Sequence, residues 1–94
     1  MDKARWNPLK NLYLKQTRGI TFDEIIHAKL LGITEHPTQT HQSILIYEHK
    51  QYVWAVPCVI NKNGTFLKTI YKSRKLMKKY NKENLNEKDE TDKI

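Results

Sequence analysis

The stretch from residue 43 to residue 71 limits most strongly what this chain can fold into. It contains runs of β-forming residues separated by turn signals. Ser43–His49 and Gln51–Ile60 are rich in Ile, Val, Tyr and Trp, and Glu48–Lys50 can form a short hairpin connection between them. Asn61–Gly64 ends in Asn-Gly, which tolerates a tight turn, and Thr65–Tyr71 alternates well enough for a third strand. We therefore expect an antiparallel meander.

A first short helix is predicted ahead of these strands. Asn7 and Pro8 are typical of the N-cap and the first position of a helix, and Gly19 supplies a C-terminal stop. Three apolar side chains follow at the spacing i, i+3 and i+4 and give the helix one apolar face: Leu9, Leu12 and Tyr13. We expect this helix to run to about Thr17.

A second helix is predicted directly after Gly19. Thr21 and Glu24 have the spacing of a capping box, and the pattern that follows extends the helix to Gly32. Residues 33–42 are polar and predict a loop or an irregular edge strand. Pro57 has no N–H to donate, so its strand should have a bulge there or a free side.

These elements predict a small α+β fold. Two N-terminal helices pack on a three- to four-stranded antiparallel sheet, and Ser73 caps a short basic helix that ends near Asn81. Residues 1–82 then form a single compact domain. Residues 83–94 contain almost no apolar side chains and are expected to be an acidic, disordered tail.

Net charge limits the possible partners. The 94 residues include 17 Lys and Arg against 10 Asp and Glu, a formal charge of +7. Residues 1–82 alone carry +10 and residues 83–94 carry −3, so the domain is more basic than the total indicates. A field of this sign attracts polyanions, namely nucleic acid, an acidic protein or an anionic membrane surface.

Several classes of protein are disfavoured by simple counts. A chain of 94 residues is too short for a TIM barrel or a multidomain enzyme. It has no apolar run long enough to cross a membrane, and its N-terminus lacks the apolar segment of a secretory signal. Its single cysteine, Cys58, cannot form an internal disulfide and is expected to be a buried structural thiol, which fits a cytoplasmic protein.

The strongest functional signal lies in residues 68–82. This segment has seven basic side chains and no carboxylate, and Tyr71 and Tyr80 are interleaved with them. The basic residues are Lys68, Lys72, Arg74, Lys75, Lys78, Lys79 and Lys82. Such cations can neutralise phosphates while aromatic rings stack on unpaired bases. The alternative interpretation is a solvated charge run that only keeps the protein soluble.

Other chemistry has weaker support in the sequence. His36 and His41 flank a loop without the Cys or carboxylate residues that would complete a metal site, so no metal is expected. The three glycines form no phosphate-binding loop, so no small-molecule cofactor is expected. His49, beside Glu48 at the predicted hairpin, is a possible general base, although such positions are commonly only exposed.

The order of these features resembles the BrnT-like toxins. Trp6-Asn7-Pro8 matches the W-[DN]-P start of that family. Residues 18–24, RGITFDE, match its K-H-G-[IV]-[ST]-F-[ED]-E corner with Arg18 at the position of the histidine, and residues 66–75, FLKTIYKSRK, match the last strand and the I-S-A-R-K segment. The resemblance covers about residues 5–80.

The resemblance implies a function as well as a fold. The family is similar to the RelE-like bacterial toxins, which are small α+β ribonucleases held inactive by a co-expressed antitoxin that often binds promoter DNA. This chain is then expected to be the toxin of a type II toxin–antitoxin system and a cytoplasmic endoribonuclease. RNA would be its substrate, the antitoxin its partner in a hetero-oligomer, and promoter DNA would be reached only through the antitoxin.

Metal-independent RNA cleavage uses the substrate's 2′-hydroxyl as the nucleophile, so the protein must align the attack, move protons and stabilise the phosphorane. The planar fork of Arg74 suits the phosphorane. The expected catalytic residues are Arg74, Lys68, Lys75, His49 and Tyr80. The expected RNA-binding residues are Arg18, Lys72, Tyr71, Lys78 and Lys79.

Two other functions are compatible with the same charge pattern. The basic helix of a non-catalytic regulator could rest on DNA or RNA, with the same steep salt dependence as a nuclease. The basic face could also be buried against an acidic partner protein. Cleavage products that end in a 2′,3′-cyclic phosphate would identify the nuclease.

Overall fold

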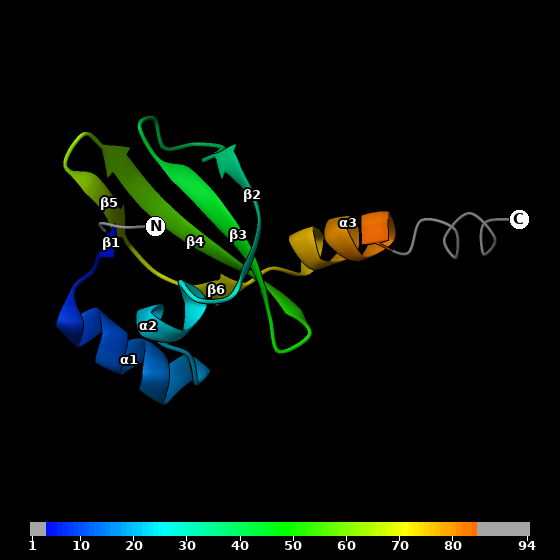
Figure 1. Ribbon diagram of the computed structural model, residues 1–94, viewed down its shortest axis with the longest axis horizontal. Coiled ribbons are helices and arrows are strands. Elements are labelled where there is room, and N and C mark those ends of the chain that lie inside the picture. The colour runs from blue at the N-terminus through cyan, green and yellow to red at the C-terminus, as the bar shows by residue number, and fades with distance from the viewer. Residues whose placement is uncertain (1–3, 85–94) are drawn as a thin grey trace, which may run out of the picture.

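A mixed β-sheet and three helices make up the part of the chain that the structure describes (Figure 1). The structure is a computed structural model that describes residues 4–84, with side chains through Tyr80. The elements in chain order are β1 (Ala4–Arg5), α1 (Pro8–Arg18), α2 (Phe22–Ile25), β2 (Lys29–Glu35), β3 (Ser43–His49), β4 (Tyr52–Asn61), β5 (Gly64–Leu67), β6 (Tyr71–Lys72) and α3 (Arg74–Asn84). The expected α+β class is confirmed. The third helix runs to Asn84, past its expected end near Asn81, and residues 85–94 of the expected acidic tail lie outside the described range.

The sheet has the strand order β1-β5-β4-β3-β2, and β6 also pairs with β4. β3 pairs with β4 along its whole length, and β2 is the edge strand beyond β3. β1 pairs with β5 in parallel, whereas the other pairs are antiparallel. The prediction of a three- to four-stranded antiparallel sheet is therefore wrong in strand number and in strand direction. β1 was missed because two residues carry too little pattern to indicate a strand.

Pro57 lies where one side of β4 changes partner. β5 pairs with the end of β4 from Cys58 to Asn61, and β6 pairs with Trp54 and Ala55. The carbonyl of Pro57 accepts a hydrogen bond from the Lys68 N–H at 2.9 Å, so its ring nitrogen also faces this interruption. Pro57 thus has no paired residue in β5 or β6, which agrees with the prediction of a bulge or a free side at this position. The single strand predicted for residues 65–71 is wrong, because the chain leaves the sheet between β5 and β6.

The ends of α1 follow the predicted signals. The Asn7 side chain accepts a hydrogen bond from the Leu9 N–H at 2.8 Å, and Pro8 is the first helical residue. Gly19 adopts a left-handed conformation with φ of 69°, and its N–H donates to the Lys15 carbonyl. The helix therefore begins and ends where local chemistry satisfies its free backbone groups.

The apolar face of α1 points away from the core. Leu9, Leu12 and Tyr13 are 74%, 61% and 49% exposed, whereas Leu14 is fully buried beneath the sheet. Asn11 holds the helix in this orientation. Its side-chain carbonyl accepts from the Phe22 N–H at 2.7 Å, and its amide donates to Asp23 at 3.1 Å. The helical spacing thus indicated a helix correctly, but the apolar face that it defined remains exposed.

The second predicted helix is wrong at its C-terminal end. The capping box is present, since Thr21 accepts from the Glu24 N–H while the Glu24 carboxylate accepts from the Thr21 N–H. However, α2 ends at Ile25, and Lys29 begins β2 rather than another helical turn. Pairing with β3 outweighs the weak helical pattern of this segment. Gly32 is not a helix stop: a Cβ there would lie 3.0 Å from the Tyr80 hydroxyl.

Two apolar clusters lie on opposite faces of the sheet. Leu14, Phe22 and Ile25 from α1 and α2 pack on the first face, against buried strand residues such as Val56 and Cys58. Burial raises the pKa of the Cys58 thiol, which fits the expected structural role. The second face packs a smaller cluster against α3, formed by Ile44, Ile46, Val53 and Ala55 with Leu31, Leu76, Met77 and Tyr80.

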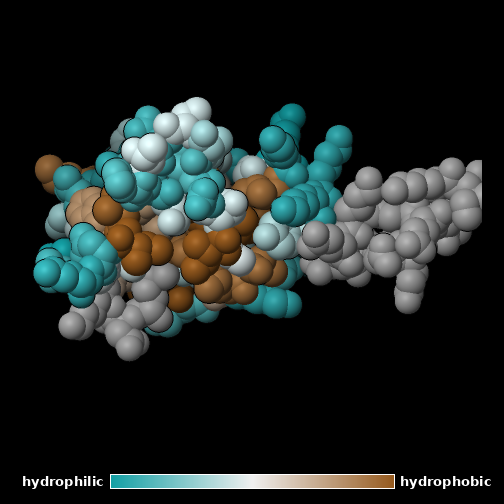
Figure 2. Space-filling model, turned by 90° about the horizontal axis from the view of Figure 1, so that it is seen from above, coloured by the Kyte–Doolittle hydropathy of each residue, from teal (hydrophilic) through white to brown (hydrophobic). Residues whose placement is uncertain are grey.

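The third helix begins at its predicted cap. The Ser73 hydroxyl accepts a hydrogen bond from the Leu76 N–H at 3.1 Å, and the Ser73 N–H donates to the Val53 carbonyl of β4. α3 extends away from the sheet (Figure 1). Figure 2 shows hydrophilic side chains gathered over α3, beside an apolar band that crosses the body of the molecule. The cap therefore fixes where the basic helix begins, while the apolar side of the helix stays packed on the second face of the sheet.

Replacing Leu14 by Ala is expected to lower the free energy of unfolding by about 2–5 kcal/mol, because it leaves a cavity in the core. Leu12→Ala removes the same atoms from an exposed position of the same helix and is expected to cost less than about 0.5 kcal/mol. Urea unfolding of the full chain, followed by tryptophan fluorescence, measures both. Equal losses would contradict the observed orientation of α1.

Candidate functional site

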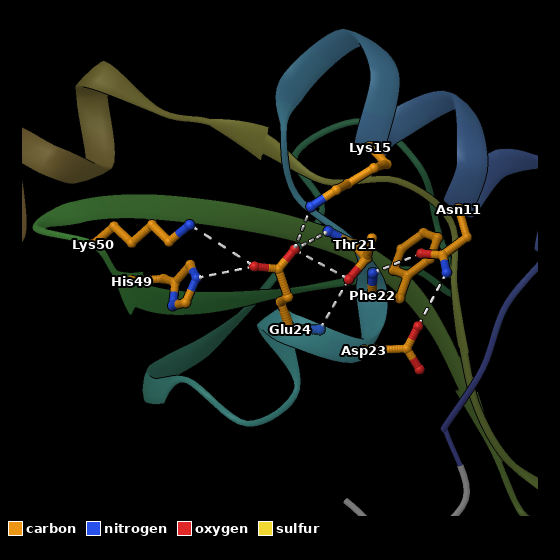
Figure 3. Close-up of polar contacts among 8 residues, drawn as sticks. All are labelled: Asn11, Lys15, Thr21, Phe22, Asp23, Glu24, His49 and Lys50. Atoms are coloured by element: carbon orange, nitrogen blue, oxygen red, sulfur yellow. Dashed lines mark hydrogen bonds and ion pairs between the residues drawn. The ribbon is translucent and has the colours of Figure 1, made fainter.

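Glu24 lies at the centre of a charged cluster between α1, α2 and the β3–β4 hairpin (Figure 3). Its Oε1 atom accepts hydrogen bonds from the Thr21 N–H at 3.1 Å and the Thr21 hydroxyl at 3.3 Å, and lies 3.9 Å from Lys15 Nζ. Its Oε2 atom lies 3.9 Å from both His49 Nε2 and Lys50 Nζ. One carboxylate therefore caps a helix with one oxygen and faces two basic side chains with the other.

These surroundings determine the charge of Glu24. Burial raises the pKa of its carboxyl, but the hydrogen bonds from Thr21 and the ammonium groups of Lys15 and Lys50 together outweigh that effect. The net result is a pKa below the ordinary value for glutamate. Glu24 is therefore ionised at neutral pH.

His49 is held at the end of β3 by the tight turn that follows it. Lys50 and Gln51 form this turn with positive φ angles of 53° and 65°, and His49 pairs with Tyr52 across it. The Trp54 indole N–H donates to the His49 carbonyl at 3.1 Å. The His49 Nε2 atom is buried and has no hydrogen-bond partner among the described residues. The ring thus directs one nitrogen at Glu24 without a hydrogen bond of ordinary length.

A cationic groove lies beside this cluster, and we use that name for the surface formed by Tyr52, Lys72, Arg74, Lys75, Met77 and Lys78. All of these except Lys72 line one pocket. The Lys72 ammonium lies over the rings of Tyr52 and Trp54, at 4.6 and 5.5 Å from their centroids. The Lys72 and Trp54 backbones are paired, which places both side chains on one face of the sheet. The groove therefore combines basic side chains with an aromatic wall.

Four of the expected site residues meet in this groove: Lys72, Arg74, Lys75 and Lys78. Arg74 and Lys75 belong to the first turn of α3, directly after the Ser73 cap. His49 lies one strand away from them, because its partner across the hairpin is Tyr52. The four basic residues that meet in the groove are thus close neighbours along the chain, carried by β6 and α3.

The remaining expected site residues lie elsewhere. The Lys68 N–H donates to the Pro57 carbonyl of β4, whereas Ser73, at the start of α3, donates to the Val53 carbonyl of the same strand. These two attachment points are four strand residues apart, which is about 13 Å along the backbone. Tyr71 pairs with Ala55 and so shares the sheet face opposite Lys72. The Tyr80 ring packs in the second apolar cluster, with the Lys79 ammonium 5.6 Å from its centroid.

Arg18 has contacts that tie two elements together. Its guanidinium donates to the Ile70 carbonyl and lies 3.4 Å from the Thr69 hydroxyl, in the segment between β5 and β6. This contact joins the C-terminal end of α1 to the chain that leads into the cationic groove. Arg18 therefore does not line the groove. It holds the segment that leads into the groove.

Tyr52 and Glu24 are the site residues that the sequence interpretation did not assign to the chemistry. Tyr52 could have been noticed as a ring beside the hairpin turn, but its basic neighbours come from residues 72–78. Glu24 was recognised only as a cap, and its contacts with His49 and Lys50 span 25 and 26 residues. Contacts of this kind have no local sequence signal.

The two loop histidines have no metal cluster around them within residues 4–84. His36 Nδ1 accepts from the N–H groups of Thr38 and Gln39, at 3.2 and 3.1 Å, and so stabilises the turn before His41. No helix in the described part of the chain has the length and apolar character needed to cross a membrane.

No protein-family model, curated protein or solved structure matches the chain.

The lowered pKa of Glu24 predicts how stability depends on pH. Because the folded-state pKa lies below the unfolded-state value, the contribution of Glu24 is complete above the unfolded value and is lost as the pH falls through the folded one. We expect the free energy of unfolding to decrease between about pH 5 and pH 3. Urea unfolding across that range should show a smaller decrease in the free energy of unfolding for Glu24→Gln than for the wild type. This variant keeps an oxygen that can cap the helix. Asp23→Asn, in the same turn, is the control, and an equally weakened decrease there would contradict the assignment.

Proposed function

We propose that this chain is the toxin of a bacterial type II toxin–antitoxin system, and that it arrests growth by cutting RNA without a metal ion. The proposal includes the RelE-like arrangement of helices and strands that the sequence resemblance implies. The observation that carries it is the cationic groove, where three basic side chains from the start of α3 line a pocket with Tyr52 and a fourth lies over the same ring.

The groove suits single-stranded RNA in two respects. Its ammonium and guanidinium groups can neutralise consecutive phosphates, which supplies affinity without sequence preference. The Tyr52 ring can stack on an unpaired base, and an aromatic platform beside a basic track is typical of single-strand binding. The groove thus offers separate contacts for the backbone and for a base.

Arg74 is the residue best suited to the reacting phosphate. Its planar fork can hold two phosphate oxygens at once, and the Ser73 cap fixes the turn of α3 from which it projects. Charge develops on those oxygens as the 2′-oxygen attacks, so a fixed cation stabilises the phosphorane more than the ground state. Lys75 and Lys78 add positive potential along the same groove.

The exposed face of α1 supports the proposed antitoxin partner. Leu9, Leu12 and Tyr13 form an apolar stripe on a helix that has basic but no acidic residues. A protein partner with apolar side chains and acidic flanks would cover this stripe. The promoter-binding role stays with the antitoxin in this proposal.

Arg74→Ala is expected to reduce the rate of RNA cleavage by about 10²–10³-fold and to abolish growth arrest, because the phosphorane loses a fixed donor. Arg74→Lys keeps the charge without the fork and should recover only part of the rate. Lys62→Ala removes one exposed positive charge in the turn that follows β4, away from the groove, and serves as the matched control. Purified variants are assayed on single-stranded RNA, and product ends are analysed for 2′,3′-cyclic phosphate.

Full cleavage by a folded Arg74→Ala variant would remove Arg74 from the mechanism. Wild-type protein that binds RNA but leaves it intact would instead favour the non-catalytic regulator. Co-expression with the neighbouring gene tests the toxin assignment separately, since growth arrest should be relieved by a cognate antitoxin.

Tyr52→Leu is expected to weaken binding of single-stranded RNA by about 5- to 150-fold, because base–aromatic stacking contributes roughly 1–3 kcal/mol. Tyr52→Phe keeps the ring and should bind like the wild type. Fluorescence anisotropy with a labelled oligonucleotide measures both at one salt concentration. Equal affinity for the Leu and Phe variants would show that the ring does not stack on the RNA.

A further inference from the structure

We propose that His49 is the base that takes the proton from the RNA 2′-hydroxyl, and that Glu24 is the positioning residue that sets the ring for this task. The inference rests on the proposed function and names the proton carrier of the same site. It is carried by the contact of Glu24 Oε2 with His49 Nε2, by the burial of that nitrogen and by the place of His49 beside the cationic groove.

His49 is close enough to the groove to act there. It pairs directly with Tyr52, so the two side chains share one face of the sheet about 5 Å apart at the backbone. Tyr52 in turn lines the groove with Arg74. In the proposed complex, a nucleotide stacks on Tyr52, places its phosphate on Arg74 and presents its ribose toward His49.

Glu24 determines which nitrogen of His49 carries the proton. The ionised carboxylate can only accept, so the nitrogen that faces it, Nε2, must be the N–H in the neutral ring. The lone pair is then on Nδ1, and the proposal assigns the substrate proton to that nitrogen. At 3.9 Å the contact is too long for a hydrogen bond, and such bonds commonly shorten when the substrate binds.

The other charges around His49 come from three elements. Lys15 on α1 and Lys50 in the hairpin turn both face Glu24, and Lys72 on β6 lies over the rings of Tyr52 and Trp54. Glu48 precedes His49 on β3, with its side chain on the other face of the strand. Glu24 is therefore the carboxylate that faces the imidazole ring among the residues described.

The reaction step balances with groups already named and water. The 2′-hydroxyl proton moves to His49 Nδ1 while the 2′-oxygen bonds to phosphorus. The bond from phosphorus to the 5′-oxygen breaks, and that oxygen takes a proton from water. The hydroxide left behind accepts the proton that His49 releases. The products are a 2′,3′-cyclic phosphate and a 5′-hydroxyl, with the protein returned to its starting state.

Glu24→Gln tests the role of the carboxylate without removing the helix cap. The amide oxygen can still accept from Thr21, because Gln satisfies a capping box as Glu does. Its NH₂ group then takes the place of Oε2 and donates toward His49 Nε2. We expect the neutral ring to change from the Nε2–H to the Nδ1–H tautomer, which ¹⁵N-correlated NMR of the full chain reads directly. Cleavage should fall in the same direction as in His49→Ala, where loss of a base costs about 10²–10⁴-fold.

Asp23→Asn is the matched control, since it neutralises a carboxylate of the same turn that contacts Asn11 and not His49. It should retain the wild-type tautomer and the wild-type rate. If the wild type cleaves RNA, the proposed function stands. An unchanged tautomer in Glu24→Gln, or full cleavage by His49→Ala, would then overturn the inference about His49 and Glu24 alone. Absence of cleavage by the wild type, with the tautomer change present, would overturn the nuclease proposal and leave the Glu24–His49 coupling established.

Discussion

The backbone pairing of β4 is the constraint on which the rest of the structure depends. β3 occupies one side of this strand, and β5 and β6 share the other side on either side of Pro57. Because Pro57 has no N–H, a continuous ladder could not pass it without a lost bond. The chain uses this interruption to leave the sheet after Leu67 and return at Tyr71. That return brings the start of α3 to the end of the sheet where the hairpin lies, beside Tyr52.

Local chemistry made much of the fold predictable. Asn7, Pro8 and Gly19 marked the ends of α1, Thr21 and Glu24 marked the start of α2, and the β3 and β4 runs were recognised from composition. Residues 29–32 of β2 were predicted as the end of a helix because the bulge between Leu30 and Gly32 disturbs the two-residue alternation, whereas residues 33–35 fall in the segment predicted as a loop or an irregular edge strand. The outward orientation of α1 was also hidden, since hydrophobic spacing identifies a face without showing what lies against it.

The candidate site was predictable only where its residues are neighbours along the chain. Lys72, Arg74, Lys75 and Lys78 could be grouped from sequence because one strand end and one helix carry them all. Tyr80 belongs to the same segment, yet the helix turns its ring into the second apolar cluster. Tyr52 and Glu24 reach the site through strand pairing and helix packing, and those contacts arise only once the chain has folded.

The hairpin turn places two requirements on the same residue. Lys50 and Gln51 both adopt left-handed backbone angles, which Asn and Gly adopt with less strain. A turn selected for folding alone would carry one of those residues, but neither has an ammonium group to place 3.9 Å from Glu24. Keeping Lys at this position therefore retains backbone strain at the tip of the hairpin in exchange for positive charge. The turn is a place where improved thermal tolerance and an intact charge cluster would select different amino acids.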